Sequence, residues 1–159
     1  MQFVDKKKTN SICGRYNNMK LYNILYVVKE TPEACDIVSG ETYHFQIRLL
    51  PESIIYRAHF PEEPITPGAC LVGIVKELTA LLLNKAAEEG TGTCREVSVT
   101  NVKNLKFLVP VRPNPLGEDS LVDVDIKITE LAVDGVSIQG TLSSPEATYT
   151  KMSLRLAYS

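Results

Sequence analysis

The alternation of apolar and polar positions marks the first half of a β-sheet. Residues 21–30, LYNILYVVKE, carry the first strand signal, and residues 42–50, TYHFQIRLL, alternate regularly. One face of the second stretch is apolar and the other is polar; the two sets are Tyr43, Phe45, Ile47 and Leu49, then His44, Gln46 and Arg48. Since a period of two places one face on a core, both stretches predict half-buried strands.

A different pattern follows in the middle of the chain. From Ala69 to Leu83 the sequence is apolar on nearly every side, which is typical of a buried helix. Pro67 suits a first helical turn and Gly90 a C-terminal stop. A helix from Pro67 to Glu89 would be about 33 Å long, because each residue adds about 1.5 Å. That length predicts a central element.

The stretches after Gly90 again read as strands. They are residues 97–111, residues 121–129, a segment after the hairpin signal Asp134-Gly135, and residues 151–158. Strands around one buried helix predict an α+β fold, in which an antiparallel sheet covers a single helix. We assign this domain to residues 19–159. Residues 1–18 show neither period, and we expect a flexible N-terminal segment there.

Composition limits the classes of function. The 159 residues carry 17 Lys+Arg and 19 Asp+Glu, a net charge of −2, so no nucleic-acid surface is expected. Four cysteines without a CxxC pair, and only two histidines, argue against a zinc site or a disulfide framework. The N-terminus has no apolar signal-peptide core, and no apolar run is long enough to span a membrane. We therefore expect a cytoplasmic protein that needs no metal or redox cofactor.

One motif before the helix carries chemistry. In HFPEEPITPG, residues 59–68, His59 is followed by a proline at every third position and then by Gly68. Prolines fix φ and stiffen the loop, and an imidazole titrates near neutral pH, so His59 is a candidate base. Gly68 would place a backbone N–H at the positive end of the helix, where no Cβ obstructs a carbonyl group. The other reading of the motif is a rigid loop with an incidental histidine.

This block resembles the HFPxxPxxPG signature of the (3R)-hydroxyacyl-acyl-carrier-protein dehydratases. Residues 101–113, NVKNLKFLVPVRP, are similar to that family's third strand and the proline-bearing turn after it, and the likeness runs from about residue 22 to the C-terminus. The resemblance implies a hot-dog fold, with a sheet wrapped around one long helix. It also implies a dimer or higher homo-oligomer that binds acyl thioesters of acyl carrier protein or coenzyme A.

The resemblance also implies roles for individual residues. His59 would remove the proton next to the thioester carbonyl, the Gly68 N–H would bind that carbonyl, and the backbone carbonyl of Ile65 would orient the histidine. The other residues assigned to the substrate site are Phe60, Pro67, Leu71, Val72 and Gly73.

The sequence departs from the family at the general acid. The family carries Glu or Asp fourteen positions after the histidine, contributed to the site of the other subunit, and this chain has Gly73 there. Glu77, one turn further, is the nearest replacement acid, although it could equally pair with a neighbour or face solvent. Glu62 and Glu63 are more typical of a solvated loop. The chain could instead be a thioesterase, which would need a carboxylate near Gly68 and for which Glu77 is again the candidate. It could also be a non-catalytic subunit that depends on a related chain, including as a heterodimer.

The remaining polar residues allow two interpretations each. Lys103, Lys106 and Arg112 could bind an acidic carrier protein, or could form a solvated strand face. His44 fits a solvated histidine, and Cys70 fits a core residue better than a nucleophile.

Overall fold

The computed structural model describes residues 19–33, 36–58, 62–89, 96–113 and 120–159. Two helices and six strands follow one another along these residues. In chain order they are β1 (Tyr26–Glu30), β2 (Thr42–Leu49), α2 (Ile54–Ala58), α3 (Gly68–Glu89), β3 (Val97–Phe107), β4 (Leu121–Ala132), β5 (Gly135–Ser143) and β6 (Thr148–Tyr158). The residues expected to form a flexible N-terminal segment, 1–18, lie outside the described residues.

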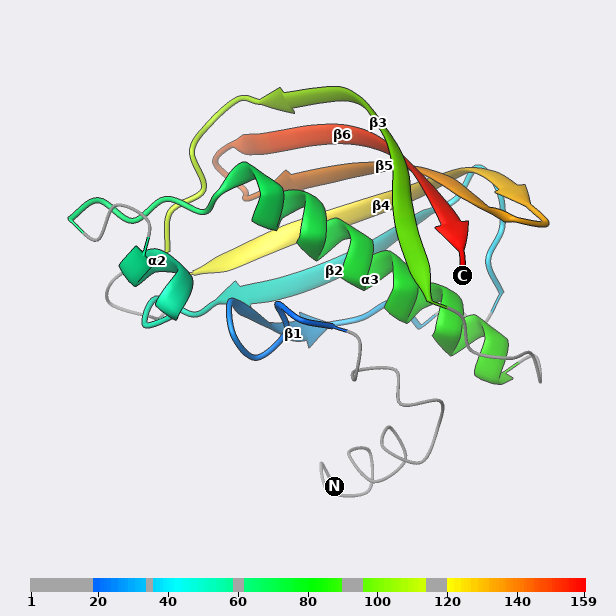
Figure 1. Ribbon diagram of the computed structural model, residues 1–159, viewed down its shortest axis with the longest axis horizontal. Coiled ribbons are helices and arrows are strands. Elements are labelled where there is room, and N and C mark those ends of the chain that lie inside the picture. The colour runs from blue at the N-terminus through cyan, green and yellow to red at the C-terminus, as the bar shows by residue number, and fades with distance from the viewer. Residues whose placement is uncertain (1–18, 34–35, 59–61, 90–95, 114–119) are drawn as a thin grey trace.

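The six strands form one antiparallel sheet with the order β1-β2-β4-β5-β6-β3. Figure 1 shows this sheet curving around α3, with β1 and β3 at its two edges and α2 near the end where α3 begins. The predicted α+β class, with one long helix against an antiparallel sheet, is confirmed.

Alternation along the strands builds the core. The face of β2 predicted to be apolar is buried, and β4, β5 and β6 contribute matching stripes. The buried residues of those three strands include Val122, Val124, Ile126, Ile128, Val136, Ile138, Leu142, Met152, Leu154 and Leu156. Helix α3 packs closely on this face, because a Cβ at Gly140 of β5 would lie 2.8 Å from Cγ1 of Val75.

Three local predictions from the sequence need correction. Strand β1 begins at Tyr26 and not at residue 21, because residues 21–25 form a turn in which Asn23 has φ 67° and Leu25 N–H donates to the Leu21 carbonyl. Strand β3 ends at Phe107 and not at residue 111, since Leu108 and Val109 both donate to the Tyr149 carbonyl and the regular ladder stops. Helix α2 was not predicted.

Strand β3 forms one edge of the sheet. β3 pairs with β6 on one side only, and its register shifts twice, between Val99 and Asn101 and between Lys103 and Lys106. Several apolar residues on β3 and just after it are exposed: Val102, Leu105, Phe107, Leu108 and Val109.

Within the described ranges, neither helix combines the length and apolar character needed to cross a membrane.

Candidate active site at the start of helix α3

A cavity of about 260 Å³ lies at the first turn of α3. Ile65, Thr66, Gly68 and Leu71 line one side, and Phe107, Val109, Pro110 and Val111 line the other. The two sides are tied together by a hydrogen bond from the Thr66 N–H to the Val111 carbonyl, at 2.8 Å. Apart from Thr66, the wall side chains are apolar, as is typical of small-molecule pockets.

The helix start supplies the polar end of this cavity. The N–H groups of Cys70 and Leu71 donate to the Pro67 carbonyl at 2.9 and 3.2 Å, so the first turn closes on the last proline of the motif. The N–H groups of a first helical turn lack acceptors within the helix, and they carry the positive end of its dipole. Gly68 therefore stands where a carbonyl oxygen could be bound.

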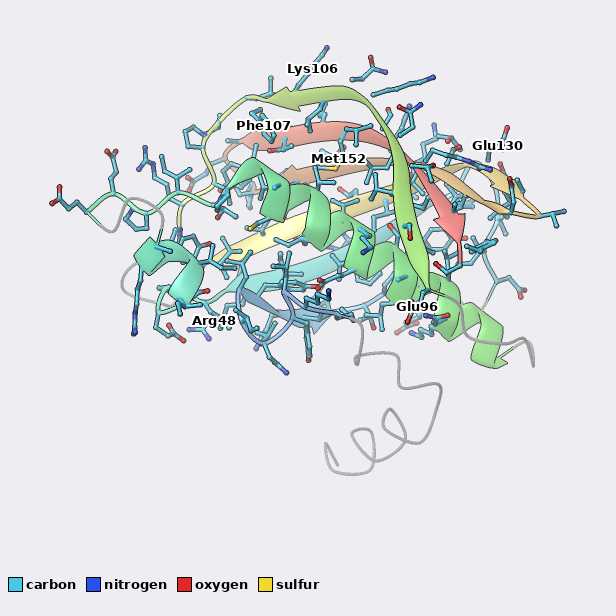
Figure 2. The ribbon with its side chains drawn as sticks, in the orientation of Figure 1. Arg48, Glu96, Lys106, Phe107, Glu130 and Met152 are labelled. Carbon is cyan, nitrogen blue, oxygen red and sulfur yellow. The ribbon has the colours of Figure 1, made fainter. Side chains whose placement is uncertain are left out.

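The ring of Phe107 lies against Gly68. A Cβ on Gly68 would be 2.6 Å from Cζ of that ring, so only glycine fits beneath the ring as it stands. Figure 2 shows Phe107, from the end of β3, beside the first turns of α3. Its side chain is nevertheless half exposed, so solvent reaches one side of it.

A buried pair of hydroxyl groups supports the loop before the helix. The Tyr56 hydroxyl of α2 and Thr66 Oγ1 are 2.8 Å apart, and both residues are buried. Burial raises the pKa of Tyr56 to about 12, with the Thr66 hydrogen bond acting in the opposite direction and Cys70 adding to the rise. Helix α2, which the sequence did not predict, thus anchors the loop that leads to Gly68.

The predicted substrate residues fall into three groups. Ile65, Gly68 and Leu71 line the cavity, and Pro67 closes the turn beside it. Val72 and Gly73 lie on α3 but are not among the residues that line the cavity. His59 and Phe60 lie outside the described residues, so their predicted roles stay predictions.

The structure gives Gly73 a packing role. A Cβ at this position would lie 2.7 Å from Cδ1 of Leu21, in the turn before β1. Leu21 therefore fills the space that the family's acidic side chain would enter. The reason for glycine inside the helix is contact with a segment 52 positions earlier, which sequence spacing gives no means to see.

The turn before β1 also donates hydrogen bonds to the carboxylate of Glu77. Oε2 accepts a hydrogen bond from the Leu21 N–H at 2.9 Å, and Oε1 accepts from the Tyr22 N–H at 3.2 Å and from the Tyr26 hydroxyl at 2.9 Å. Glu77 is buried, with 6% of its surface exposed. It thus faces neither Lys76 nor solvent, and its two oxygens hold the turn before β1 against α3.

Cys70 and His44 fit their expected structural roles. Burial, with a smaller effect from the charge of Glu77, raises the pKa of the Cys70 thiol, which favours the neutral form over a nucleophilic thiolate. His44 lies on the solvent side of β2, and its Nδ1 is 2.8 Å from Oδ1 of Asp125 on β4.

The three basic residues predicted to meet a carrier protein are all exposed, but they differ in their neighbours. Lys106 lies opposite Lys151 of β6, and Lys103 lies opposite Ser153, so two like charges face each other across the ladder. Arg112 pairs with Glu63 at 3.0 Å, which places Glu63 at an exposed ion pair. Two lysines directly opposite each other on a strand pair repel each other, and an acidic partner would reduce this repulsion.

A curved antiparallel sheet around one helix, with an apolar cavity at the helix start, defines a hot-dog protein. The chain belongs to the ApeI-like family, described as ApeI dehydratase, whose sequence profile matches residues 36–124, more than half of the chain.

Curated relatives agree with this family. The chain is 29% identical over 75 residues to the 3-hydroxyacyl-(acyl-carrier-protein) dehydratase FabZ of Wolbachia sp. subsp. Brugia malayi, covering 47% of this chain and 49% of that one. It is 27% identical over 82 residues to the FabZ of Campylobacter fetus, covering 50% and 55%. The chain thus spans about half the length of these relatives.

Solved structures share the fold. The dehydratase heterocomplex ApeI:P from Xenorhabdus doucetiae superimposes with a TM-score of 0.67 and 13% identity, over 93% of this chain and 91% of that one. A protein described as a putative thioesterase, yhdA from Lactococcus lactis, gives a TM-score of 0.57 and 10% identity, over 86% and 95%. At these identities the likeness shows the hot-dog fold alone.

Proposed function

We propose that this chain is a subunit of a dehydratase that converts (3R)-3-hydroxyacyl thioesters of acyl carrier protein or coenzyme A into trans-2-enoyl thioesters. The observation that carries the proposal is the apolar cavity that ends at Gly68, directly after the His59 motif. Membership of a dehydratase family supports the same reaction. We place this reaction in fatty-acid or related lipid synthesis in the cytoplasm.

The proposed chemistry uses two groups of this chain. The Gly68 N–H binds the thioester carbonyl oxygen and stabilises the negative charge that grows there. His59 takes the proton from the carbon next to that carbonyl. The electron pair of this C–H bond forms the new double bond as the 3-hydroxyl leaves, and an acid donates the proton that makes the hydroxyl leave as water.

We propose that the acid comes from another subunit. Both oxygens of Glu77 are engaged by donors from the turn before β1, and Leu21 fills the space at Gly73. A related chain with a glutamate at the equivalent helix position would complete the site across an interface. The solved neighbour from Xenorhabdus doucetiae is itself a dehydratase heterocomplex, which favours this arrangement over a homodimer with two self-sufficient sites.

Strand β3 is the proposed interface. Val102 pairs with the buried Leu154, and Phe107 pairs with Thr150, so both belong to the face that packs on α3. Both are nevertheless exposed, and β3 is an edge strand of the sheet. A second subunit paired along β3 would satisfy the edge and bury these side chains.

The carrier protein is proposed to dock beside the same edge. Lys103, Lys106 and Lys151 present positive charge on the outer face of β3 and β6, and none of them takes part in the ion pairs found among the described residues. Arg112 would have to leave Glu63 to join them, which costs little because exposed ion pairs are weak.

A turnover assay tests the proposal. The purified chain would be given 3-hydroxyacyl thioesters of several chain lengths on acyl carrier protein and on coenzyme A. We expect saturable binding and formation of the enoyl thioester that is abolished in His59→Ala. Because a missing general acid typically costs ~10²–10⁴ in rate, the chain alone should be slow. Release of free thiol from acyl-coenzyme A, undiminished in His59→Ala, would instead identify a thioesterase and overturn the proposal.

A further inference from the structure

One buried hydroxyl group on β6 has no hydrogen-bond partner. Thr150 is fully buried, and its Oγ1 is the one buried side-chain nitrogen or oxygen among the described residues that lacks a partner. Burying an unpaired hydroxyl destabilises a protein, and valine would fill the same volume without that cost. An unsatisfied group of this kind therefore calls for an explanation.

The position of Thr150 places it next to the candidate site. It faces Phe107 in the β3–β6 ladder, and directly paired residues of an antiparallel ladder point to the same face. That face is the inner one, because Met152, two residues further along β6, is buried against the core. Figure 2 shows Met152 and Phe107 on the side of the sheet where α3 lies.

Phe107 connects Thr150 to the carbonyl-binding position. Its ring lies against Gly68 at one end, and its Cβ stands beside Thr150 on the neighbouring strand at the other. Phe107 is 55% exposed and is the last residue of β3. A ring that turned away from Gly68 would leave a space bordered by Gly68 and by the strand that carries Thr150.

The head of a 3-hydroxyacyl thioester matches this space. It carries two oxygens, the thioester carbonyl and the hydroxyl two carbons away, joined by a short apolar chain. The cavity walls are otherwise apolar, and the Thr66 hydroxyl is already paired with Tyr56. A hydroxyl group can both donate and accept, so Thr150 can bind the 3-oxygen whichever way its proton points.

We propose that Thr150 is a substrate-binding residue that recognises the 3-hydroxyl of the acyl chain, with Phe107 as the side chain that must move to admit it. The proposal rests on the proposed dehydratase function, and it adds a determinant that separates 3-hydroxyacyl from unsubstituted acyl thioesters. The cost of the unpaired hydroxyl in the free protein is relieved when substrate binds, so stability and recognition oppose each other at this position.

Thr150→Val tests this directly. The substitution keeps the shape and removes the hydroxyl, and we expect the melting temperature to rise by about 2–4 °C. Binding would be measured for 3-hydroxyacyl-pantetheine and for the saturated acyl-pantetheine of the same length. The wild type should prefer the hydroxylated ligand by roughly fivefold to tenfold, the range that one hydrogen bond supplies. The variant should lose that preference through weaker binding of the hydroxylated ligand alone.

Two further variants keep the test decisive. Thr150→Ser restores a hydroxyl and should restore the preference, whereas Thr150→Ala should abolish it even if valine is not tolerated. Thr79→Val is the matched control, because the Thr79 hydroxyl is equally buried but donates to the Val75 carbonyl within α3, at 2.7 Å. It should leave both affinities unchanged.

The outcomes separate this inference from the proposed function. If the wild type binds both ligands equally, or if Thr150→Val and Thr150→Ala keep the preference, the role of Thr150 is overturned while thioester binding stands. If the wild type binds neither ligand, the proposed function fails, and the role of Thr150 fails with it.

Discussion

Replacing Glu77 with glutamine is the sharpest perturbation of the contact between α3 and the turn before β1. The carboxylate accepts three hydrogen bonds, two from backbone N–H groups and one from the Tyr26 hydroxyl. Glutamine has one acceptor oxygen and one NH₂ group in place of two acceptor oxygens. Whichever way the amide points, its NH₂ group faces the N–H of Leu21 or of Tyr22, and one part-buried donor loses its acceptor.

The expected cost follows from this geometry. Hydrogen bonds to a charged group contribute ~1.5–3 kcal/mol each, and a buried donor without an acceptor costs about 1–3 kcal/mol. The hydrogen bond from Tyr26 survives, because its hydroxyl can rotate to accept from an NH₂ group. We therefore expect Glu77→Gln to lower the free energy of unfolding by about 2–3 kcal/mol, which corresponds to a fall in melting temperature of roughly 5–10 °C for a chain of this size.

Urea denaturation and amide hydrogen exchange measure the effect. Exchange at Leu21 and Tyr22 should accelerate more than exchange in the central strands, because the turn is released before the core opens. Glu63→Gln is the matched control. Glu63 is exposed, and its one ion pair among the described residues is with Arg112, so its substitution should change the free energy of unfolding by less than about 0.5 kcal/mol.

One outcome would refute the reasoning. If Glu77→Gln is as stable as the wild type but dehydration falls by ~10²–10⁴, the carboxylate is the general acid and does not hold the turn. A loss of stability accompanied by less than a tenfold change in dehydration rate would support the structural role.

Three more predictions follow from the site. Gly73→Glu should destabilise the chain by displacing Leu21. The double variant that also carries Leu21→Ala should recover stability and gain dehydration activity. A double variant that is stable but inactive would contradict the idea that the site lacks only its acid. Above pH 10 the unfolded Tyr56 phenol ionises while the folded one, with a pKa of about 12, stays neutral. Stability should therefore fall by up to roughly 3 kcal/mol as the pH rises from 10 towards 12. Tyr56→Phe should flatten that slope, although it loses the Thr66 contact, and an unchanged slope would show that another group is responsible. Val102→Asp should shift a dimer towards monomer in light scattering, and an unaltered dimer would place the interface away from β3.

Most of the fold could be predicted because it depends on periodicity. The alternating residues of β2 and β4 lie on the core face as expected, since a period of two leaves only one face to bury. Helix α3 begins one residue after Pro67 and reaches Glu89 as predicted, because an apolar run between a proline and a glycine has well-marked ends. The prediction of a strand at residues 21–25 was wrong. Their apolar residues lie in a turn that depends on Asn23 and on contacts with α3.

The site was only partly predictable. Gly68 was predicted from a local motif and Leu71 from the family resemblance, and both line one cavity. The hydrogen-bond partners of Glu77 lie 51 to 56 positions away in the chain, and no local sequence pattern predicts them. Thr150 lies just outside the predicted last strand, residues 151–158, and an unpaired hydroxyl becomes visible only when its surroundings are known.

The most direct test of the account is whether the Gly68 N–H binds the thioester carbonyl. The backbone amide of Gly68 can be followed by NMR in ¹⁵N-labelled protein during titration with 3-hydroxyacyl-pantetheine. We expect its resonance to move saturably, together with those of Leu71 and Phe107, while the amides of Leu21 and Tyr22 stay in place. Saturable binding that leaves the Gly68 amide unmoved would contradict the assignment of this helix start as the thioester site.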